Sequence, residues 1–306
     1  MEFLYMLEKI RTPFLDGLMR VVTELGGEMI YMVVAIVVFW CVSKNLGYYI
    51  LTTGFVGTIA NQFMKLAFRV PRPWVLDERF TIVESARAGA AGYSFPSGHT
   101  QNVFSTFGSI GRWTKSKPVR ILCAAAVVLV AFSRMYLGVH TPKDVCLAFI
   151  MGLVLVFVLY PIFRDIDKHP KRMYAAFGVM LGVTLAYLCY TELWPFPQDI
   201  DVGNLEAGKK AGYSLLGASA GMLLAFMIDT RYVHFDVRAG MLAQVVKVVV
   251  GLAVTLLIKE GLKAPLALLP IGTGAATAAR YFVVIVFAAG VWPMTFRWFS
   301  SWKKKT

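Results

Sequence analysis

Long apolar runs separated by short polar loops form the dominant pattern along the chain. A helix that crosses a membrane needs about 20 mostly apolar residues, because the hydrocarbon core is about 30 Å thick. Nine runs are candidate spans, of which the third is short and relatively polar: Gly27–Val42, Gly47–Phe68, His99–Trp113, Val119–Gly138, Thr141–Phe163, Met173–Tyr190, Ala211–Ile228, Gly240–Ile258 and Ala276–Phe299. The pattern predicts an all-α fold, a polytopic membrane helical bundle of about nine transmembrane helices.

The first 26 residues show a different pattern, in which acidic side chains alternate with large apolar ones at helical spacing. Apolar residues on one helical face and charged residues on the other are typical of helices that lie in the membrane interface. Glu2, Glu8, Asp16 and Glu24 interrupt the segment where a signal peptide would need an uncharged core, so we expect none. We therefore expect residues 1–26 to form an interfacial amphipathic segment.

The composition agrees with a membrane protein and excludes a soluble domain of average composition. Of the 306 residues, 58% are hydrophobic and 16% are charged, and the mean hydropathy is +0.63. The net charge of +13 is compatible with nucleic-acid binding, but the basic residues gather in loops between apolar runs. Membrane orientation and anionic headgroups explain this distribution, so we expect membrane lipids as partners and no nucleic acid. The 4 cysteines fall in predicted spans without C-x-x-C spacing, so neither a disulfide nor a zinc site is expected.

The basic loops predict the orientation of the chain in the membrane. Loops 112–120 and 164–172 are short and strongly basic, which places both in the cytoplasm under the positive-inside rule. Counting spans from these loops puts the N-terminus outside and the C-terminal Lys303, Lys304 and Lys305 inside. The same count brings the long loop 69–98 and the short turn 134–144 out on one face, the outer one. Two polar segments that are distant in sequence are therefore expected to lie on the same side.

Three cations stand at the outer ends of predicted spans: Lys65, Arg72 and Arg134. Charge at membrane depth is costly unless it is paired or functional, and three cations on one face require an anion. Phosphate fits best, because arginine binds its oxygens in bidentate fashion and lysine supplies a point charge. Each cation taken alone is equally explained as an interfacial anchor whose long side chain reaches the headgroups.

The segment Phe95–Thr100, with the sequence FPSGHT, precedes one of the apolar runs. Ser97 and Gly98 would lie at a helix N-terminus, where free backbone N–H groups and the helix dipole favour an anion. Gly98 has no side chain to block an approaching group, and the Ser97 hydroxyl can donate a hydrogen bond. His99 would then stand beside the bound group and could pass a proton to a leaving oxygen. The alternative for Ser97 is a simple helix cap.

A second histidine, His140, stands just before the run that begins at Thr141. Thr141, Pro142 and Asp144 have the order of an N-cap, a first helical residue and a third helical residue. From that position Asp144 could reach back to one ring nitrogen of His140 and leave the other free to attack phosphorus. The alternative for Asp144 is capping-box chemistry without a catalytic role.

These residues form three motifs in a fixed order: Lys65-x6-Arg72-Pro73, Pro96-Ser97-Gly98-His99, and Ser133-Arg134-x5-His140-x3-Asp144. In all three the chain resembles the type 2 phosphatidic acid phosphatase superfamily. That superfamily also includes glucose-6-phosphatase-like and sphingosine-phosphate-phosphatase-like membrane enzymes and the vanadium haloperoxidases. The motifs span Lys65 to Asp144, with no substitution at a functional position.

The resemblance implies a metal-independent phosphatase that needs no cofactor. It assigns phosphate binding to three cations, a serine and a glycine N–H group: Lys65, Arg72, Arg134, Ser97 and Gly98. It also assigns His140 as the nucleophile that forms a phosphohistidine, Asp144 as the group that orients it, and His99 as the proton donor to the leaving alcohol. The phosphatase core would occupy residues 27–190, and residues 191–306 would add three C-terminal transmembrane helices.

We therefore expect a cell-membrane enzyme that hydrolyses a lipid phosphate or pyrophosphate, with a polyprenyl, phosphatidate or sphingoid tail, on the outer face. The nine-span layout with an external N-terminus resembles the glucose-6-phosphatase and sphingosine-phosphate-phosphatase branch. The alternatives are a lipid phosphotransferase, a sugar-phosphate phosphatase, and a protein that only binds or transports a phosphorylated lipid. A haloperoxidase is disfavoured because those enzymes are soluble.

Two features of the C-terminal runs have more than one interpretation. The small residues Gly217–Gly221 allow close helix packing, either within the chain or in a homodimer. Lys247 is an intramembrane lysine, but it lies within about two turns of the inner end of its run, so a structural role is favoured.

Overall fold

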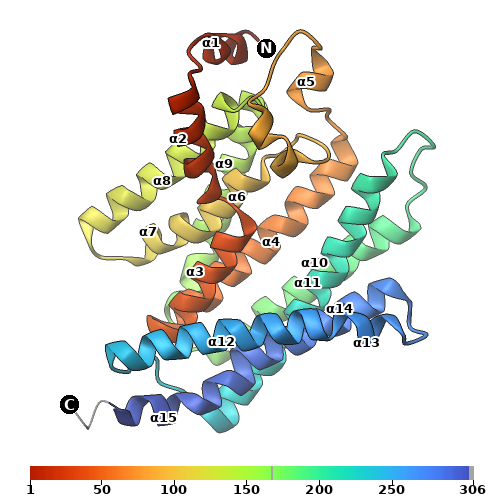
Figure 1. Ribbon diagram of the computed structural model, residues 1–306. Helices are drawn as coiled ribbons and strands as arrows, with labels where there is room; N and C mark the ends of the chain where they lie inside the picture. Colours follow the sequence, from red (N-terminus) through yellow and green to blue (C-terminus); the bar gives the residue numbers. More distant parts are fainter. Residues whose placement is uncertain (167, 303–306) are drawn as a thin grey trace. The chain divides into compact units, whose positions relative to one another are not determined.

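The computed structural model describes residues 1–166 and 168–302, and the regular structure in these residues is entirely helical, which confirms the all-α fold class (Figure 1). The first half of the chain contains α1 (Glu2–Lys9), α2 (Pro13–Glu24), α3 (Glu28–Cys41), α4 (Lys44–Phe68), α5 (Pro73–Leu76), η1 (Glu84–Ala86), η2 (Ala88–Ala90), α6 (Gly98–Val103), η3 (Phe104–Gly108), α7 (Ser109–Trp113), α8 (Lys117–Tyr136) and α9 (Pro142–Arg164). The second half contains α10 (Pro170–Leu193), α11 (Val202–Ile228), η4 (Asp229–Val233), α12 (Met241–Gly261), α13 (Lys263–Ala267), α14 (Gly272–Val286), η5 (Phe287–Val291), η6 (Trp292–Thr295) and α15 (Phe296–Ser301).

The chain forms two compact units whose boundaries cut through three helices. The first unit comprises Met1–Ala35, Tyr48–Arg164 and Asp199–Leu205, and the second comprises Ile36–Gly47, Asp165–Gln198 and Glu206–Thr306. All of the predicted phosphate-binding and catalytic residues fall in the first unit, together with the N-terminal helices α1 and α2.

The number of membrane-spanning helices differs from the prediction. Among the described residues, 6 helices are long and apolar enough to cross a membrane, or up to 7 if α2 and α3, which meet at 45°, form one bent span. The prediction of about nine spans is therefore not confirmed. The predicted second run is α4, a helix of 25 residues whose polar side chains, Asn61, Gln62 and Lys65 among them, lower its hydropathy. The predicted third run is short and is interrupted by the π-helical turn η3.

Residues 1–26 fold as α1 and α2, with a helix start that the sequence encodes locally. Thr12 caps α2, because its hydroxyl accepts a hydrogen bond from the Leu15 N–H at 3.3 Å, and Pro13 occupies the first helical position. Each helix buries one side, as at Leu4 and Leu7 of α1, and exposes large apolar side chains on the other.

In the second unit, Lys247 has a structural role. Its side chain is fully buried, and its ammonium group donates hydrogen bonds to the Trp40 carbonyl at 2.8 Å and the Val237 carbonyl at 3.2 Å. The ammonium nitrogen also lies 4.2 Å from the centre of the Phe296 ring. These partners compensate for removal of the charge from water, so the structural interpretation of this intramembrane lysine is supported.

The small residues of α11 are used for packing inside the chain. A methyl group at Gly217 would overlap the Ala278 carbonyl of α14, and one at Gly221 would lie 2.9 Å from the Phe282 carbonyl. Glycine at these two positions therefore lets α11 and α14 approach closely, as the small-residue spacing predicts.

Candidate functional site

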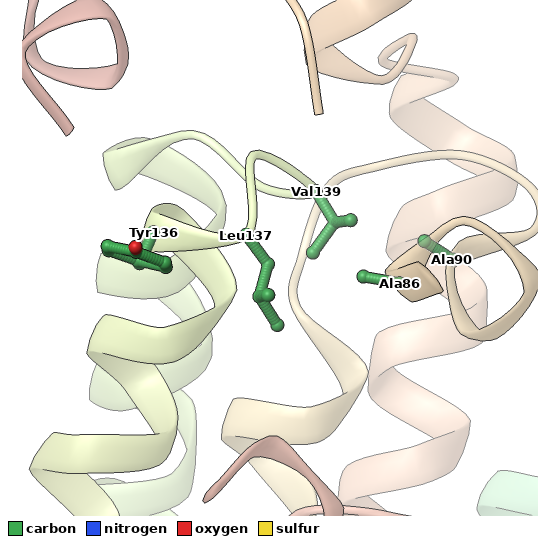
Figure 2. Packing of buried hydrophobic residues seen from close by; sticks show 5 residues of the cluster. All are labelled: Ala86, Ala90, Tyr136, Leu137 and Val139. Atoms are coloured by element: carbon green, nitrogen blue, oxygen red, sulfur yellow. The ribbon is translucent and has the colours of Figure 1, made fainter. Parts of the chain in front are cut away.

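The loop that carries His140 is fixed by its backbone and by an apolar cluster. After α8 ends, Gly138 turns the chain with a φ of +78°, a left-handed conformation that glycine adopts without strain. The N–H groups of Val139 and His140 then both donate to the Arg134 carbonyl, at 3.1 and 3.3 Å. Figure 2 shows the buried cluster around this loop: Tyr136, Leu137 and Val139 from the end of α8 and the turn, with Ala86 and Ala90 from the segment 84–90. The position of His140 is therefore set by packing as well as by sequence.

The two ring nitrogens of the buried His140 side chain have different partners. Nε2 lies 3.0 Å from Nη1 of Arg72. Because arginine can only donate, Nε2 must accept this bond and carry no proton. The proton of the neutral ring is then on Nδ1, which lies 3.4 Å from both Oδ2 of Asp144 and Oγ of Ser94. This arrangement leaves the lone pair of Nε2 facing Arg72.

The surroundings of His140 keep its ring neutral. Burial lowers the pKa of His140 well below 6.5, and the nearby positive charges of Arg72, Arg134 and Lys65 lower the pKa further. At neutral pH the side chain is therefore a neutral imidazole with no proton on Nε2, which is the form that can act as a nucleophile.

Asp144 makes contacts that suit both of the roles that the sequence left open. Its Oδ2 accepts a hydrogen bond from the Thr141 N–H at 2.7 Å, and Oγ1 of Thr141 lies 3.4 Å from the Asp144 N–H, as in a capping box. The same Oδ2 also lies beside Nδ1 of His140 and accepts a 2.6 Å hydrogen bond from the Ser94 hydroxyl. Sequence reasoning missed Ser94, which carries no motif signal beyond its place one residue before Phe95.

The FPSGHT segment lies directly against the start of α9. The Ser97 N–H donates to the Asp144 carbonyl at 3.1 Å, and the Asn61 amide donates to the Pro96 carbonyl at 3.3 Å. Oγ of Ser97 accepts bonds from the Thr100 N–H at 3.4 Å and hydroxyl at 3.0 Å, so Ser97 is the N-cap of α6. A hydroxyl that accepts still has its own proton to donate, so the cap does not exclude a contact with a ligand.

Gly98 faces open space at the first turn of α6. A methyl group added to Gly98 would meet no other atom of the described chain within 4 Å. The first N–H groups of a helix have no partner within the helix, so the Gly98 N–H is available to an anion placed in this space.

The guanidinium group of Arg72 is largely engaged within the protein. Nε donates to the Gly92 carbonyl at 2.8 Å and Nη2 to the Ala91 carbonyl at 3.0 Å, while Nη1 is shared by His140 and the Val139 carbonyl at 2.9 Å. Burial lowers the pKa of Arg72 to about 10, so the group stays protonated at neutral pH. Arg72 thus holds two loops together and places one positive charge at Nε2 of His140.

The guanidinium group of Arg134 is engaged on one side only. Arg134 is 2% exposed, and its Nη1 donates to the Thr23 hydroxyl at 2.7 Å. Its Nε and Nη2 are buried and have no hydrogen-bond partner among the residues that the structure describes. Buried, unpartnered donors are costly, and a phosphate oxygen is the partner that suits this planar edge best.

Lys65 and His99 complete the site, and both are half-buried. Lys65 interacts electrostatically with Arg72, Arg134 and Asp144 and makes no hydrogen bond within the described part of the chain. His99 interacts electrostatically with Arg134, Lys65 and Arg72. The structure therefore brings the predicted residues of all three motifs together in one place, with cations in excess of anions.

Comparison with known proteins gives two family matches. The PAP2 superfamily matches residues 42–168, which include all the residues of the site, and the transmembrane extension of PAP2 superfamily phosphatases matches residues 213–304. Both matches bear the name of one superfamily, and between them they extend over most of the chain.

Individual relatives are distant and varied. Phosphatidylglycerophosphatase B of Bacillus subtilis is 28% identical over 173 residues, which are 53% of this chain and 80% of the relative. A probable sphingosine-1-phosphate phosphatase of Dictyostelium discoideum is 24% identical over 243 residues, or 74% of this chain and 57% of the relative. An undecaprenyl-diphosphatase of Sulfolobus acidocaldarius is 27% identical over 145 residues, which are 47% of this chain and 68% of the relative. No solved structure matches the chain significantly. Together with the geometry of the site, the two family matches show that the chain belongs to the PAP2 superfamily and is one of its phosphatases.

Proposed function

We propose that this protein is an integral-membrane, metal-independent phosphatase that hydrolyses a lipid phosphate or pyrophosphate through a phosphohistidine intermediate. The observation that carries the proposal is the buried, neutral His140, whose Nε2 lies beside Arg72 while Asp144 lies beside its Nδ1. This is the arrangement of an activated nucleophile with an orienting carboxylate, next to groups that bind an anion.

The relatives support a lipid as the substrate. They are named for the hydrolysis of phosphatidylglycerophosphate, sphingosine-1-phosphate and undecaprenyl diphosphate, whose common feature is a phosphate on a long apolar tail. The site lies at the ends of long apolar helices, where such a tail can remain among the helices while the phosphate meets the polar groups. We therefore propose a polyprenyl, phosphatidate or sphingoid phosphate as the substrate class.

Substrate binding would use the unpartnered donors of the site. The Arg134 edge formed by Nε and Nη2 would take two phosphoryl oxygens, and Lys65 would contribute a point charge. The Gly98 N–H and the Ser97 hydroxyl would bind a third oxygen at the start of α6. Arg72 would transfer its Nη1 bond from Nε2 of His140 to the phosphate, which frees the lone pair at the moment of binding.

The reaction would then proceed in two displacements. Nε2 of His140 forms a bond to phosphorus as the bond to the leaving oxygen breaks. His99, which the negative charge of the bound phosphoryl group would keep protonated against the surrounding cations, donates a proton to the leaving alcohol or phosphate. His99, now neutral, takes a proton from water, whose oxygen attacks phosphorus and breaks the bond to Nε2. Inorganic phosphate leaves, and both histidines return to their starting states. Asp144 balances the positive charge that the His140 ring carries in the intermediate.

We also propose that the site faces the extracytoplasmic side and that the C-terminus is cytoplasmic. The support is the basic character of the loops 112–120 and 164–172. The basic tail Lys303–Lys305 agrees in sequence, but it lies outside the residues that the structure describes.

Phosphate release from a panel of substrates tests the proposal. The protein, purified in detergent with EDTA present, is expected to release phosphate from short-chain phosphatidate, sphingosine phosphate or a polyprenyl pyrophosphate. Preference for glucose 6-phosphate would assign a sugar-phosphate phosphatase instead, and a phosphorylated lipid acceptor among the products would assign a phosphotransferase. Binding of these lipids without any release of phosphate would contradict an enzymatic function.

Replacement of Gly98 by alanine tests whether phosphate occupies the space beside Gly98, without disturbing the fold. The added methyl group meets no atom of the described chain beyond its own helical segment and suits a helix, so the melting temperature of Gly98→Ala should be at or above the wild-type value. The methyl would nevertheless occupy part of the open space that we propose for the phosphate, so kcat/KM should fall about 100-fold. Gly182→Ala in α10, where a methyl is also unopposed, is the matched control; it should leave kcat/KM unchanged and should not lower the melting temperature. Wild-type activity of Gly98→Ala would exclude a phosphate at this N–H group.

A further inference from the structure

The guanidinium group of Arg134 makes a single hydrogen bond within the described chain. Nη1 donates to the Thr23 hydroxyl at 2.7 Å, and Nε and Nη2 are buried without a partner. A guanidinium group is planar, so a bond that fixes Nη1 also fixes the direction of the opposite edge. Thr23 is 4% exposed and lies 111 residues before Arg134 in the chain.

Thr23 belongs to a segment that is packed against the site. Helix α2 lies along α8, the helix that carries Arg134 (Figure 1). Just beyond Thr23 the chain bends by 45° between α2 and α3. At this bend a methyl group on Gly26 would lie 2.6 Å from the His99 carbonyl, so the turn that follows α2 packs closely against the start of α6. The hydroxyl of Thr23 is therefore placed by a close fit to both motif-bearing helices.

The N-terminal arm, which we define as α1 and α2 (residues 2–24), is attached to the loops around the site by further polar contacts. The Tyr5 hydroxyl donates to Asp77 at 2.7 Å, and the Tyr136 hydroxyl donates to Asp16 at 2.9 Å. One contact is made by α1 and the other by α2, so together they fix the position of the arm along α8. The position of Thr23 relative to Arg134 is fixed with it.

Arg11, which lies between the two helices of the arm, attaches the arm to two further segments. Its Nε donates to the Tyr136 carbonyl at 3.0 Å and its Nη1 to the Thr81 carbonyl at 2.8 Å. Tyr136 is the last residue of α8, and the turn after it leads to His140. The arm is thus connected to both sides of the site, although it lies before residue 42, where the PAP2 superfamily match begins.

We propose that Thr23 is a positioning residue for the phosphatase reaction. Its hydroxyl accepts a hydrogen bond from Nη1 of Arg134 and thereby directs Nε and Nη2 of Arg134 at the phosphoryl group. The inference rests on the proposed function for its catalytic consequence, but it makes a separate statement about phosphate binding. Without the hydroxyl, Nη1 loses its partner and the guanidinium group is free to rotate away from the phosphate.

The test compares two substitutions at this position, with inorganic phosphate as the probe. Thr23→Val keeps the shape of the side chain and removes the hydroxyl, whereas Thr23→Ser keeps the hydroxyl. In the full-length protein in detergent, the rise in melting temperature with phosphate concentration gives the dissociation constant without any turnover. Loss of a hydrogen bond to a charged group should raise this constant and the KM for lipid phosphate about tenfold in Thr23→Val, with a smaller change in kcat. Thr23→Ser should restore values close to the wild type.

A matched control and a double variant make the test specific. Thr52 in α4 is also buried, and its hydroxyl has no hydrogen-bond partner among the described residues, so Thr52→Val should leave phosphate affinity unchanged. If Thr23 acts through Arg134, Thr23→Val should add little to the effect of Arg134→Lys. The proposal would be overturned if Thr23→Val and Thr52→Val had equal phosphate affinities, or if the effects of Thr23→Val and Arg134→Lys multiplied as independent ones.

The outcomes also distinguish this inference from the proposed function. Tenfold weaker phosphate binding in Thr23→Val, with no hydrolysis of any phosphorylated lipid by the wild type, would support the positioning role and contradict the phosphatase assignment. Hydrolysis by the wild type with unchanged phosphate affinity in Thr23→Val would do the reverse.

Discussion

Replacement of His140 by alanine is expected to lower kcat/KM for phosphate release by at least about 10⁴-fold, because it removes the atom that bonds to phosphorus. The buried ring faces Arg72 on one side and Asp144 on the other, so no neighbouring group can take over its geometry. Steady-state release from the best lipid substrate gives the rate. A rapid acid-free quench with labelled substrate should also trap protein-bound phosphate in the wild type and none in His140→Ala.

The control for this variant is His169→Ala. His169 is an exposed histidine that precedes α10 and has no part in the site, so its replacement should leave phosphate release unchanged. Comparable melting temperatures would show that His140→Ala is folded. Activity of His140→Ala within tenfold of the wild type would exclude His140 as the nucleophile.

Asp144→Asn should give the second-largest loss, about 10³-fold in kcat or more. An asparagine oxygen can still accept the hydrogen bonds of Thr141 and Ser94, so the start of α9 should keep its structure. The negative charge beside Nδ1 is lost, however, and with it the stabilisation of the positively charged ring that forms when Nε2 attacks. The change should therefore appear in kcat with little change in phosphate affinity, measured by thermal stabilisation.

Thr141→Ala separates the catalytic role of Asp144 from its capping role. This change removes the hydroxyl of the capping box and leaves the carboxylate in place, so it should cost about 1 kcal/mol of stability and little activity. If Thr141→Ala and Asp144→Asn lowered kcat to the same extent, the carboxylate would be only a cap.

The position of the site was largely predictable from the sequence, because motif spacing and helix-end chemistry are local properties. Ser97 at an N-cap and Asp144 three residues after Thr141 were both recognisable without coordinates, and both have the predicted local contacts. The sequence could not decide whether Asp144 is a cap or an orienting group. The structure gives it both contacts, through one carboxylate oxygen that serves Thr141, Ser94 and His140.

The sequence could not predict that Arg72 and Arg134 have different hydrogen-bond partners. Arg72 and Arg134 stand in equivalent positions as cations at helix ends. Only the fold shows that Arg72 donates its hydrogen bonds to backbone carbonyls and His140. In Arg134, by contrast, Nε and Nη2 have no partner in the described chain. The count of about nine membrane spans is not confirmed for a different reason, since the polar side chains of α4 make it a poor span by composition although it is a long helix.

The sequence by itself determined the helical class, the apolar runs and the residues that we propose to bind and transfer phosphate. It could do so because hydrophobic periodicity and motif spacing are encoded by residues close together in the chain. Only the tertiary structure decided that Ser94 supports Asp144 and that Thr23 holds Arg134 across 111 residues. Such contacts depend on where packed helices bring distant side chains, and no local pattern in the chain specifies that.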